Sequence, residues 1–224
     1  MLSKIIVSVL PGIVFCIIFY LIDKNKNKKR TINLIIMFLL GGIGAYITYR
    51  LEWHFGSYFP EFKDSNMWQI LLYGIFGVAI FEEGFKWFCT SLFTYSNKIK
   101  DMFSVIVYSV FCSAGFAVFE TLINYTSVLN LNNLIRRGFS AVPHHICFAI
   151  IMGFLIGFGK FKKKVFYIIG LIITILIHAI SNWFIYKPGM FDYRIYFINY
   201  VLLLCVSIYI CIYVRKKGVK IWES

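Results

Sequence analysis

Charged residues are scarce in this chain of 224 residues, and their scarcity excludes an ordinary soluble domain. Lys, Arg, Asp and Glu make up 15% of the chain, and hydrophobic residues make up 60%, against about 25% and about 45–50% in soluble domains. The chain also lacks a long polar stretch, because its longest polar connection covers only residues 50–67. No internal repeat or low-complexity tract divides it. We therefore expect a single membrane-embedded domain over residues 1–224.

The six cysteines also lack a pattern. They show no paired spacing, and all fall within apolar segments: Cys16, Cys89, Cys112, Cys147, Cys205 and Cys211. Disulfides and a thiolate metal site are therefore not expected, and the cysteines are interpreted as buried apolar residues.

Long apolar segments recur along the chain with polar breaks between them. Each has about 20 residues, the length that crosses about 30 Å of hydrocarbon as a helix. Seven such segments cover approximately residues 5–22, 32–49, 68–95, 102–125, 139–159, 165–186 and 196–214. The first is expected to be retained, because no small-x-small cleavage site follows it. The sequence predicts an all-α, polytopic membrane protein with about seven transmembrane helices.

The basic residues border these segments unevenly, although the formal net charge is +13. Most occupy alternate connections: Lys24, Lys26, Lys28, Lys29 and Arg30; Lys98 and Lys100; Lys160, Lys162, Lys163 and Lys164; and Arg215, Lys216, Lys217 and Lys220. The positive-inside rule then places the N-terminus outside and the C-terminus in the cytoplasm of a plasma membrane. The basic residues suit an anionic lipid leaflet, and no nucleic-acid partner is expected.

Ionisable residues inside the segments are the strongest functional signal. An ionised side chain at mid-bilayer costs roughly 2.5–3.5 kcal/mol even on lenient scales, so such residues usually mark function. Four consecutive segments, the third to the sixth, contribute them: Glu82, Glu83 and Lys86; Glu120; His144 and His145; and His178. We expect one polar active-site cavity among these four helices.

Helical spacing refines this cavity. Residues three or four apart share a helix face, as do Glu82 with Lys86, and His178 with Asn182. Asn124 follows Glu120 at the same spacing. Glu82 and Glu83 point in different directions, because neighbours lie about 100° apart around a helix. The expected orientation puts the later polar residues toward the outer leaflet, so we expect the cavity to open there.

Three chemistries fit these residues. A carboxylate beside a cavity water can act as a general base, while histidine and asparagine can donate hydrogen bonds to an oxyanion. The same side chains could bind zinc, with Glu82, Glu120, His145 and His178 as ligands, although no His-Glu-x-x-His motif is present. Acid and histidine chains also relay protons in transporters, but no inverted repeat favours that alternative.

The order of these motifs resembles a known family. It runs Glu82-Glu83-x-x-Lys86, Gly115-Phe116-Ala117-x-x-Glu120-x-x-x-Asn124-Tyr125, Arg137 with Pro143-x-His145 and Gly153, and His178-x-x-x-Asn182. Over about residues 70–185 this pattern resembles the PrsW family of intramembrane proteases. More distantly it is similar to CAAX prenyl endopeptidases and bacteriocin-processing membrane proteases.

The resemblance implies a glutamate-type endopeptidase that makes the first, outer-side cut in a single-pass membrane protein such as an anti-sigma factor. It implies a water activated by Glu82, support of Glu82 from Glu83 and Lys86, and an oxyanion bound by His178 and Asn182. Glu120 and His145 would complete the catalytic set, with Asn124, Arg137 and His144 in support. No cofactor is expected, with zinc as the alternative.

The chain departs from the family pattern in two places. Thr121 stands where an asparagine usually follows the acid, and His144 adds a second histidine before His145. Because of the first departure, the side-chain amide that the family pattern has next to the acid is missing. Asn124 could supply this amide instead. The second leaves open which histidine acts.

Overall fold

The computed structural model describes residues 1–56, 58, 66–96, 99, 101–186 and 193–217. Within these residues every regular element is a helix, in the order α1 (Leu2–Ile22), α2 (Lys28–Gly56), α3 (Met67–Tyr73), η1 (Gly74–Ala79), α4 (Ile80–Ser96), α5 (Met102–Asn124), α6 (Leu131–Phe161), α7 (Val165–Tyr186) and α8 (Tyr193–Lys217). The α3, η1 and α4 elements follow one another without a break, and η1 is a π-helical turn.

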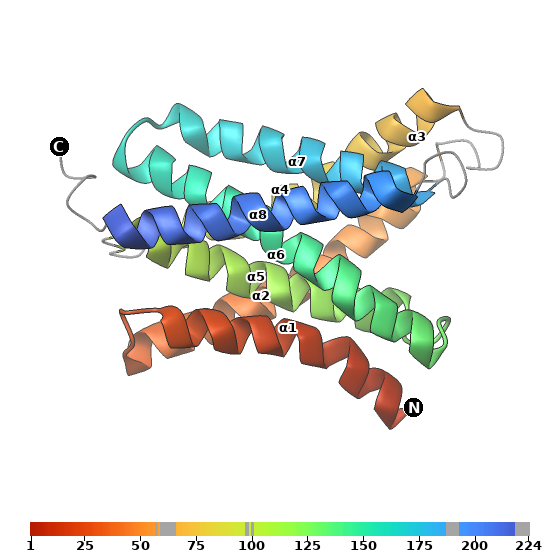
Figure 1. Ribbon diagram of the computed structural model, residues 1–224, viewed down its shortest axis with the longest axis horizontal. Coiled ribbons are helices and arrows are strands. Elements are labelled where there is room, and N and C mark those ends of the chain that lie inside the picture. Colours follow the sequence, from red (N-terminus) through yellow and green to blue (C-terminus); the bar gives the residue numbers. More distant parts are fainter. Residues whose placement is uncertain (57, 59–65, 97–98, 100, 187–192, 218–224) are drawn as a thin grey trace.

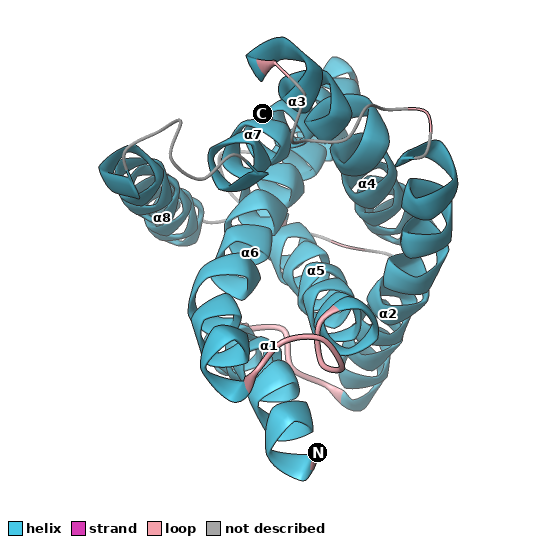
Figure 2. Cartoon of the chain, turned by 90° about the vertical axis from the view of Figure 1, so that its right-hand side faces the viewer, coloured by secondary structure: helices cyan, strands magenta, loops and turns pink. Residues whose placement is uncertain are grey.

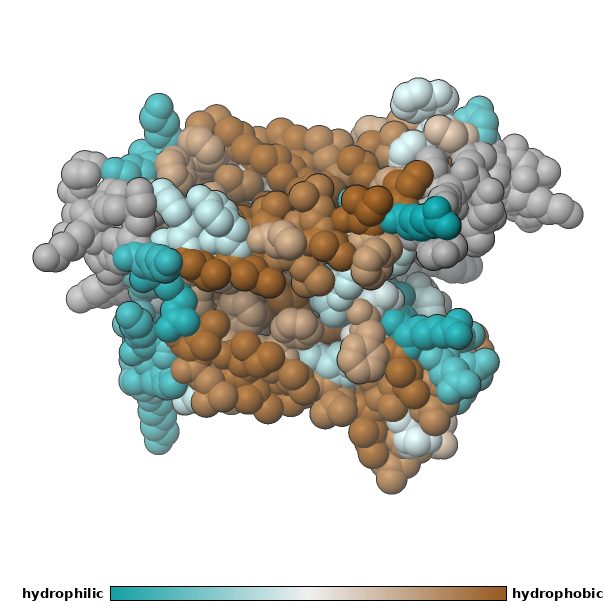
Figure 3. Space-filling model, in the orientation of Figure 1, coloured by the Kyte–Doolittle hydropathy of each residue, from teal (hydrophilic) through white to brown (hydrophobic). Residues whose placement is uncertain are grey.

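Seven helical segments of the described chain are long and apolar enough to cross a membrane, with α3, η1 and α4 counted as one. They lie roughly side by side in one bundle, with the start of α1 and the end of α8 near opposite ends (Figure 1). A broad hydrophobic band covers the middle of the face in Figure 3, and hydrophilic residues lie toward both ends. The prediction of a seven-span helical membrane protein is confirmed.

The central helices are α5 and α6. In its apolar window α5 is 94% buried, whereas α8 is only 11% buried. The α5 helix packs against α1, α2, α4 and α6, and α7 packs on α6 and η1. Seen along the bundle in Figure 2, α8 stands at the edge, beside α6 and α7.

Small residues allow α2 and α5 to touch. A Cβ at Gly41 would collide with the Cys112 carbonyl, and one at Gly115 would collide with the Phe38 carbonyl. Because the backbones approach this closely, neither position has room for a side chain. Such close approach at small residues is typical of packed membrane helices.

Two helices extend beyond the predicted apolar segments. The α2 helix continues through the expected polar connection as far as Gly56, and α6 begins at Leu131. The Asn130 side chain accepts a hydrogen bond from the Asn133 N–H and caps α6. Residues 57 and 59–65 of the polar connection expected over residues 50–67 lie outside the described residues.

A proline interrupts α6 just before its two histidines. Pro143 has no N–H, so it cannot bond the carbonyl of Phe139 four residues earlier. The Tyr200 hydroxyl of α8 donates to that carbonyl instead, at 3.1 Å. This bond attaches the loosely packed α8 to α6 beside the polar site.

Candidate active site

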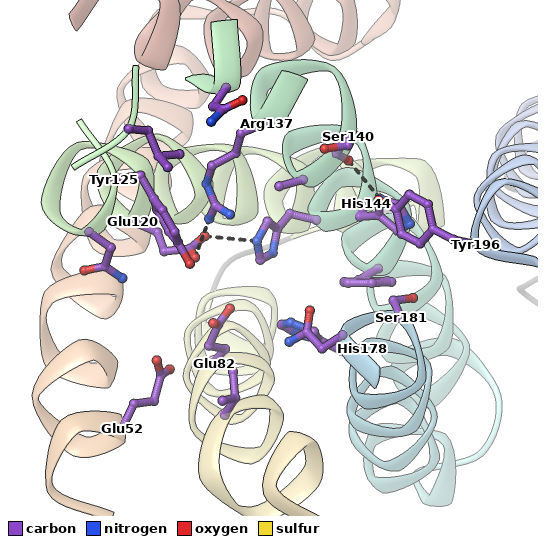
Figure 4. Close-up of a pocket in the computed structure, with 18 residues that line it drawn as sticks. Glu52, Glu82, Glu120, Tyr125, Arg137, Ser140, His144, His178, Ser181 and Tyr196 are labelled. Carbon is purple, nitrogen blue, oxygen red and sulfur yellow. Dashed lines mark hydrogen bonds and ion pairs between the residues drawn. The ribbon is translucent and has the colours of Figure 1, made fainter. Parts of the chain in front are cut away.

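A pocket of about 340 Å³ lies at the end of the bundle where α2 and α5 end and α6 begins. Figure 4 shows its polar side chains converging from several helices. The labelled lining residues are Glu52, Glu82, Glu120, Tyr125, Arg137, Ser140, His144, His178, Ser181 and Tyr196. Each of the four helices predicted to share a cavity contributes to it.

The two neighbouring glutamates lie in the first turn of α4, directly after the π turn. Both are buried, and the Lys86 ammonium reaches each of them, 3.2 Å from Glu82 Oε2 and 2.9 Å from Glu83 Oε1. The ammonium also lies 3.9 Å from the centre of the Phe116 ring. Lys86 therefore compensates both carboxylates rather than Glu82 alone.

Lys86 also fixes the tautomer of His145. Its ammonium lies 3.1 Å from His145 Nδ1, and because a lysine ammonium can only donate, Nδ1 accepts. The proton of the neutral ring is then on Nε2, which donates to Glu120 Oε2 at 3.2 Å. A continuous polar chain therefore joins the glutamates of α4 to Glu120 of α5 through Lys86 and His145.

Arg137 holds the other oxygen of Glu120. Its Nη2 lies 2.5 Å from Glu120 Oε1, and its Nε donates to Thr121 Oγ1 at 3.3 Å. The guanidinium also stacks over the Tyr125 ring, 3.6 Å from its centre. Thr121, which departs from the family pattern, thus helps to orient Arg137. Burial raises the pKa of Tyr125 to about 12, so this phenol remains neutral near pH 7.

His178 of α7 is oriented by Glu83. Its Nδ1 lies 2.8 Å from Glu83 Oε1, and since a carboxylate accepts, Nδ1 carries the proton. The neutral ring therefore presents a lone pair on Nε2. It can donate to an oxyanion only when protonated, whereas the Asn182 amide, which also lines the pocket, can always donate.

The two neighbouring histidines are separated by their contacts. His144 stacks on Tyr196 and lies tilted against Tyr200, both of α8, with ring centres 5.5 and 4.8 Å away. Its Nδ1 bonds the Ser140 carbonyl at 2.8 Å. Of the two, His145 belongs to the chain of charged groups, and His144 links α6 to α8 at the pocket wall.

Glu52 is a pocket residue that the sequence did not predict. It was placed in a polar connection, but α2 continues through it and brings its carboxylate to the pocket (Figure 4). Its Oε1 is buried without a hydrogen-bond partner among the described residues. The sequence offered one sign that Glu52 faces the interior: it follows Ala45 and Thr48, which lie on the buried face of α2, at helical intervals.

Three acidic and histidine side chains could hold a metal ion. Glu82, Glu83 and His178 each offer a ligand atom, and these atoms lie within 4.8 Å of one another. Glu83 Oε2 is buried and lacks a hydrogen-bond partner among the described residues. A carboxylate oxygen in this state is available to bind a metal ion. The expected alternative set also included Glu120 and His145, which instead contact Arg137 and Lys86.

A buried site of acids and histidines within a bundle of membrane-spanning helices is what one class of protein, the intramembrane hydrolases, requires. Comparison with known proteins makes the assignment specific. Residues 29–211 match the sequence model of a family described as PrsW family intramembrane metalloprotease. The chain belongs to the PrsW family and is an intramembrane protease, so the transporter alternative has no support.

Relatives named Protease PrsW agree with this assignment. The one from Clostridioides difficile (strain 630) is 30% identical over 204 residues, which cover 83% of this chain and 81% of the relative. The one from Oceanobacillus iheyensis is 29% identical over 223 residues, 97% of each chain. The one from Geobacillus kaustophilus is 25% identical over 198 residues, 86% of this chain and 84% of the relative. No solved structure matches the chain.

Proposed function

We propose that this protease makes the outer-side cut in a single-pass membrane protein, with an anti-sigma factor as the substrate type. The cut would let a second intramembrane protease release a sigma factor. The pocket's place at the end of the bundle where α5 ends and α6 begins supports this proposal. The distribution of lysine and arginine along the sequence supports an outer-side location of that end in the plasma membrane.

The proposed chemistry uses Glu82 as the general base. Its carboxylate lines the pocket while Lys86 holds one of its oxygens. Glu82 removes a proton from water as the water oxygen attacks the peptide carbonyl, and the proton then passes to the leaving amine. Asn182 and protonated His178 donate hydrogen bonds to the oxyanion. The single observation that carries this assignment is that Glu82 and His178 face the same pocket from different helices.

Metal-assisted hydrolysis is the second candidate, favoured by the family's description and by the partnerless Glu83 Oε2. The residues present fit a zinc ion, which Glu82, Glu83 and His178 would hold. Zinc bound there would supply a Lewis acid and lower the pKa of a bound water. In this alternative Lys86 and Arg137 still hold the neighbouring carboxylates.

Glu82→Gln tests the site in purified protease with a membrane-anchored substrate. Loss of the base is expected to lower turnover by about 10²–10⁴-fold. Thermal stability and elution in detergent should show that the variant is folded. Wild-type turnover by a folded Glu82→Gln protein would contradict the proposal.

Chelation separates the two candidates. Activity that a chelator removes and added zinc restores would favour the metal mechanism. Activity that survives prolonged chelation, with Glu82 still required, would favour the glutamate mechanism. Comparing membrane proteins from cells with wild-type and Glu82→Gln enzyme would identify the substrate.

A further inference from the structure

A second pocket, of about 750 Å³, lies along the later turns of α4 and shares no lining residue with the active site. Its walls come from α4 and α7, and one end is lined by the last turn of α6 and the connection between α6 and α7. We call it the α4–α7 groove. Its lining includes Phe88, Leu92, Tyr95 and Ile168, with Lys160 and Lys164 at the basic end.

The walls of the groove face the surroundings of the protein. Phe88, Leu92 and Ile168 are each more than half exposed although they lie in membrane-spanning helices. In a bilayer this exposure places them against lipid chains. The groove is therefore an apolar channel at membrane depth that ends at two lysines.

Three polar side chains of the groove bear on what could bind there: Lys160, Lys164 and Ser91. The Lys160 ammonium donates to the Thr94 carbonyl at 2.7 Å and so joins α6 to α4. Lys164 is exposed. Ser91 Oγ is buried in the groove wall without a hydrogen-bond partner among the described residues. An occupant with an apolar tail and an anionic, hydrogen-bonding head matches this distribution.

We infer that the α4–α7 groove binds one anionic phospholipid, with an acyl chain along Phe88, Leu92 and Ile168 and the phosphate at Lys160 and Lys164. Lysine is a common phosphate ligand, and the end of the groove has the charge that an acidic headgroup requires. The volume lies in the range of about 300–1,000 Å³ typical of small-molecule sites, which favours a lipid over a transmembrane helix of a substrate. The proposed orientation assigns this lipid to the cytoplasmic leaflet.

Occupancy of the groove would act on the helix that carries the catalytic glutamates. Glu82 and Glu83 lie in the first turn of α4, and the groove begins at Trp87, one residue after Lys86. Trp87 Nε1 donates to the Tyr167 carbonyl at 2.7 Å, and this bond already joins α4 to α7 here. A ligand that binds the folded protein stabilises it, so bound lipid would stabilise this packing.

The test compares two variants of equal charge. Lys164→Gln removes a groove lysine, whereas Lys163→Gln removes its neighbour, which does not line the groove. The full chain is reconstituted in phosphatidylcholine vesicles with and without phosphatidylglycerol, extracted, and examined by native mass spectrometry for retained lipid. Wild type and Lys163→Gln should retain phosphatidylglycerol, and Lys164→Gln should lose it by about fivefold, as expected for one lysine near an anionic lipid.

Ile168→Trp tests the apolar wall while keeping both lysines. This substitution fills the groove and should also reduce phosphatidylglycerol retention.

Equal losses in the two lysine variants, or no preference for phosphatidylglycerol over phosphatidylcholine, would overturn the proposal. A substrate helix that crosslinks to Leu92 in competition with lipid would assign the groove to substrate instead. Lipid retention is measured without proteolysis, so its failure is distinct from failure of the proposed function.

Discussion

At the scale of single residues, the position of Lys86 explains why two acids can lie side by side in an apolar helix. Its ammonium contacts both glutamates and His145 at 2.9–3.2 Å, and all four side chains are buried. Removing one partner of a buried ion pair costs about 3–5 kcal/mol, because the remaining charge is uncompensated. Lys86 is therefore a structural requirement of the site.

Lys86→Met should lower the apparent melting temperature in detergent and abolish proteolysis. Adding Glu83→Gln should recover part of the stability but no activity, because it removes one of the uncompensated carboxylates. A double-mutant cycle of thermal stability measures this coupling. Simple addition of the two destabilising effects would show that the ion pair is energetically unimportant.

Arg137→Lys should lower activity about tenfold or more, because lysine cannot hold Glu120 and Thr121 together and loses the planar stack on Tyr125. Arg136→Lys is the matched control, since Arg136 is adjacent and exposed. Turnover of a membrane-anchored substrate by both variants is the measurement. Equal activity of the two variants would remove Arg137 from the site.

At the scale of elements, the sequence predicted helices and their polar faces but not their ends. The α2 helix runs past its apolar segment because its buried face continues through Thr48 to Glu52, although charged and polar residues interrupt the apolar run there. The start of α6 at Leu131 depends on the cap from the Asn130 side chain. A hydropathy profile cannot predict such a cap. The bond between Lys86 and His145 could not be predicted either, because it depends on how two helices rotate against each other.

The α2–α5 contact gives a prediction at this scale. Gly41→Ala should lower thermal stability by an amount equivalent to about 1–3 kcal/mol, because its Cβ would strike the Cys112 carbonyl. Gly84→Ala is the control, since a Cβ there would meet nothing within 4 Å. It should be neutral or slightly stabilising, because alanine favours a helix. Melting curves in one detergent check both, and equal effects would contradict the close-contact interpretation.

At the scale of the whole molecule, the seven spans were predictable because hydropathy and length suffice for a membrane helix. The gathering of polar residues from four spans was also predictable, since a bilayer makes isolated polar groups costly. The separate contacts of His144 and His145 were not, because both lie on one helix and only the packing of α4, α5 and α8 around it distinguishes them.

Cysteine labelling of intact cells tests the proposed orientation. Asn133→Cys, at the pocket end, should react with a membrane-impermeant maleimide, and Lys163→Cys should react only after lysis. The wild type is the control for the six native cysteines, which lie within helices. The reverse pattern would place the active site on the cytoplasmic side and exclude an outer-side cut.

The π turn of Gly74–Ala79 determines where the chain before α4 can lose a residue. In it the Ile80 N–H bonds the Ile75 carbonyl five residues earlier, so the turn holds one residue more than an α-helical turn. Deleting one residue there would restore an α-helical turn and leave Glu82 and Lys86 on their present faces. A deletion of Gly84 would instead rotate Lys86 by about 100° away from Glu82. The chain before α4 therefore has a place where a residue can be lost without changing the angular position of Glu82 and Lys86.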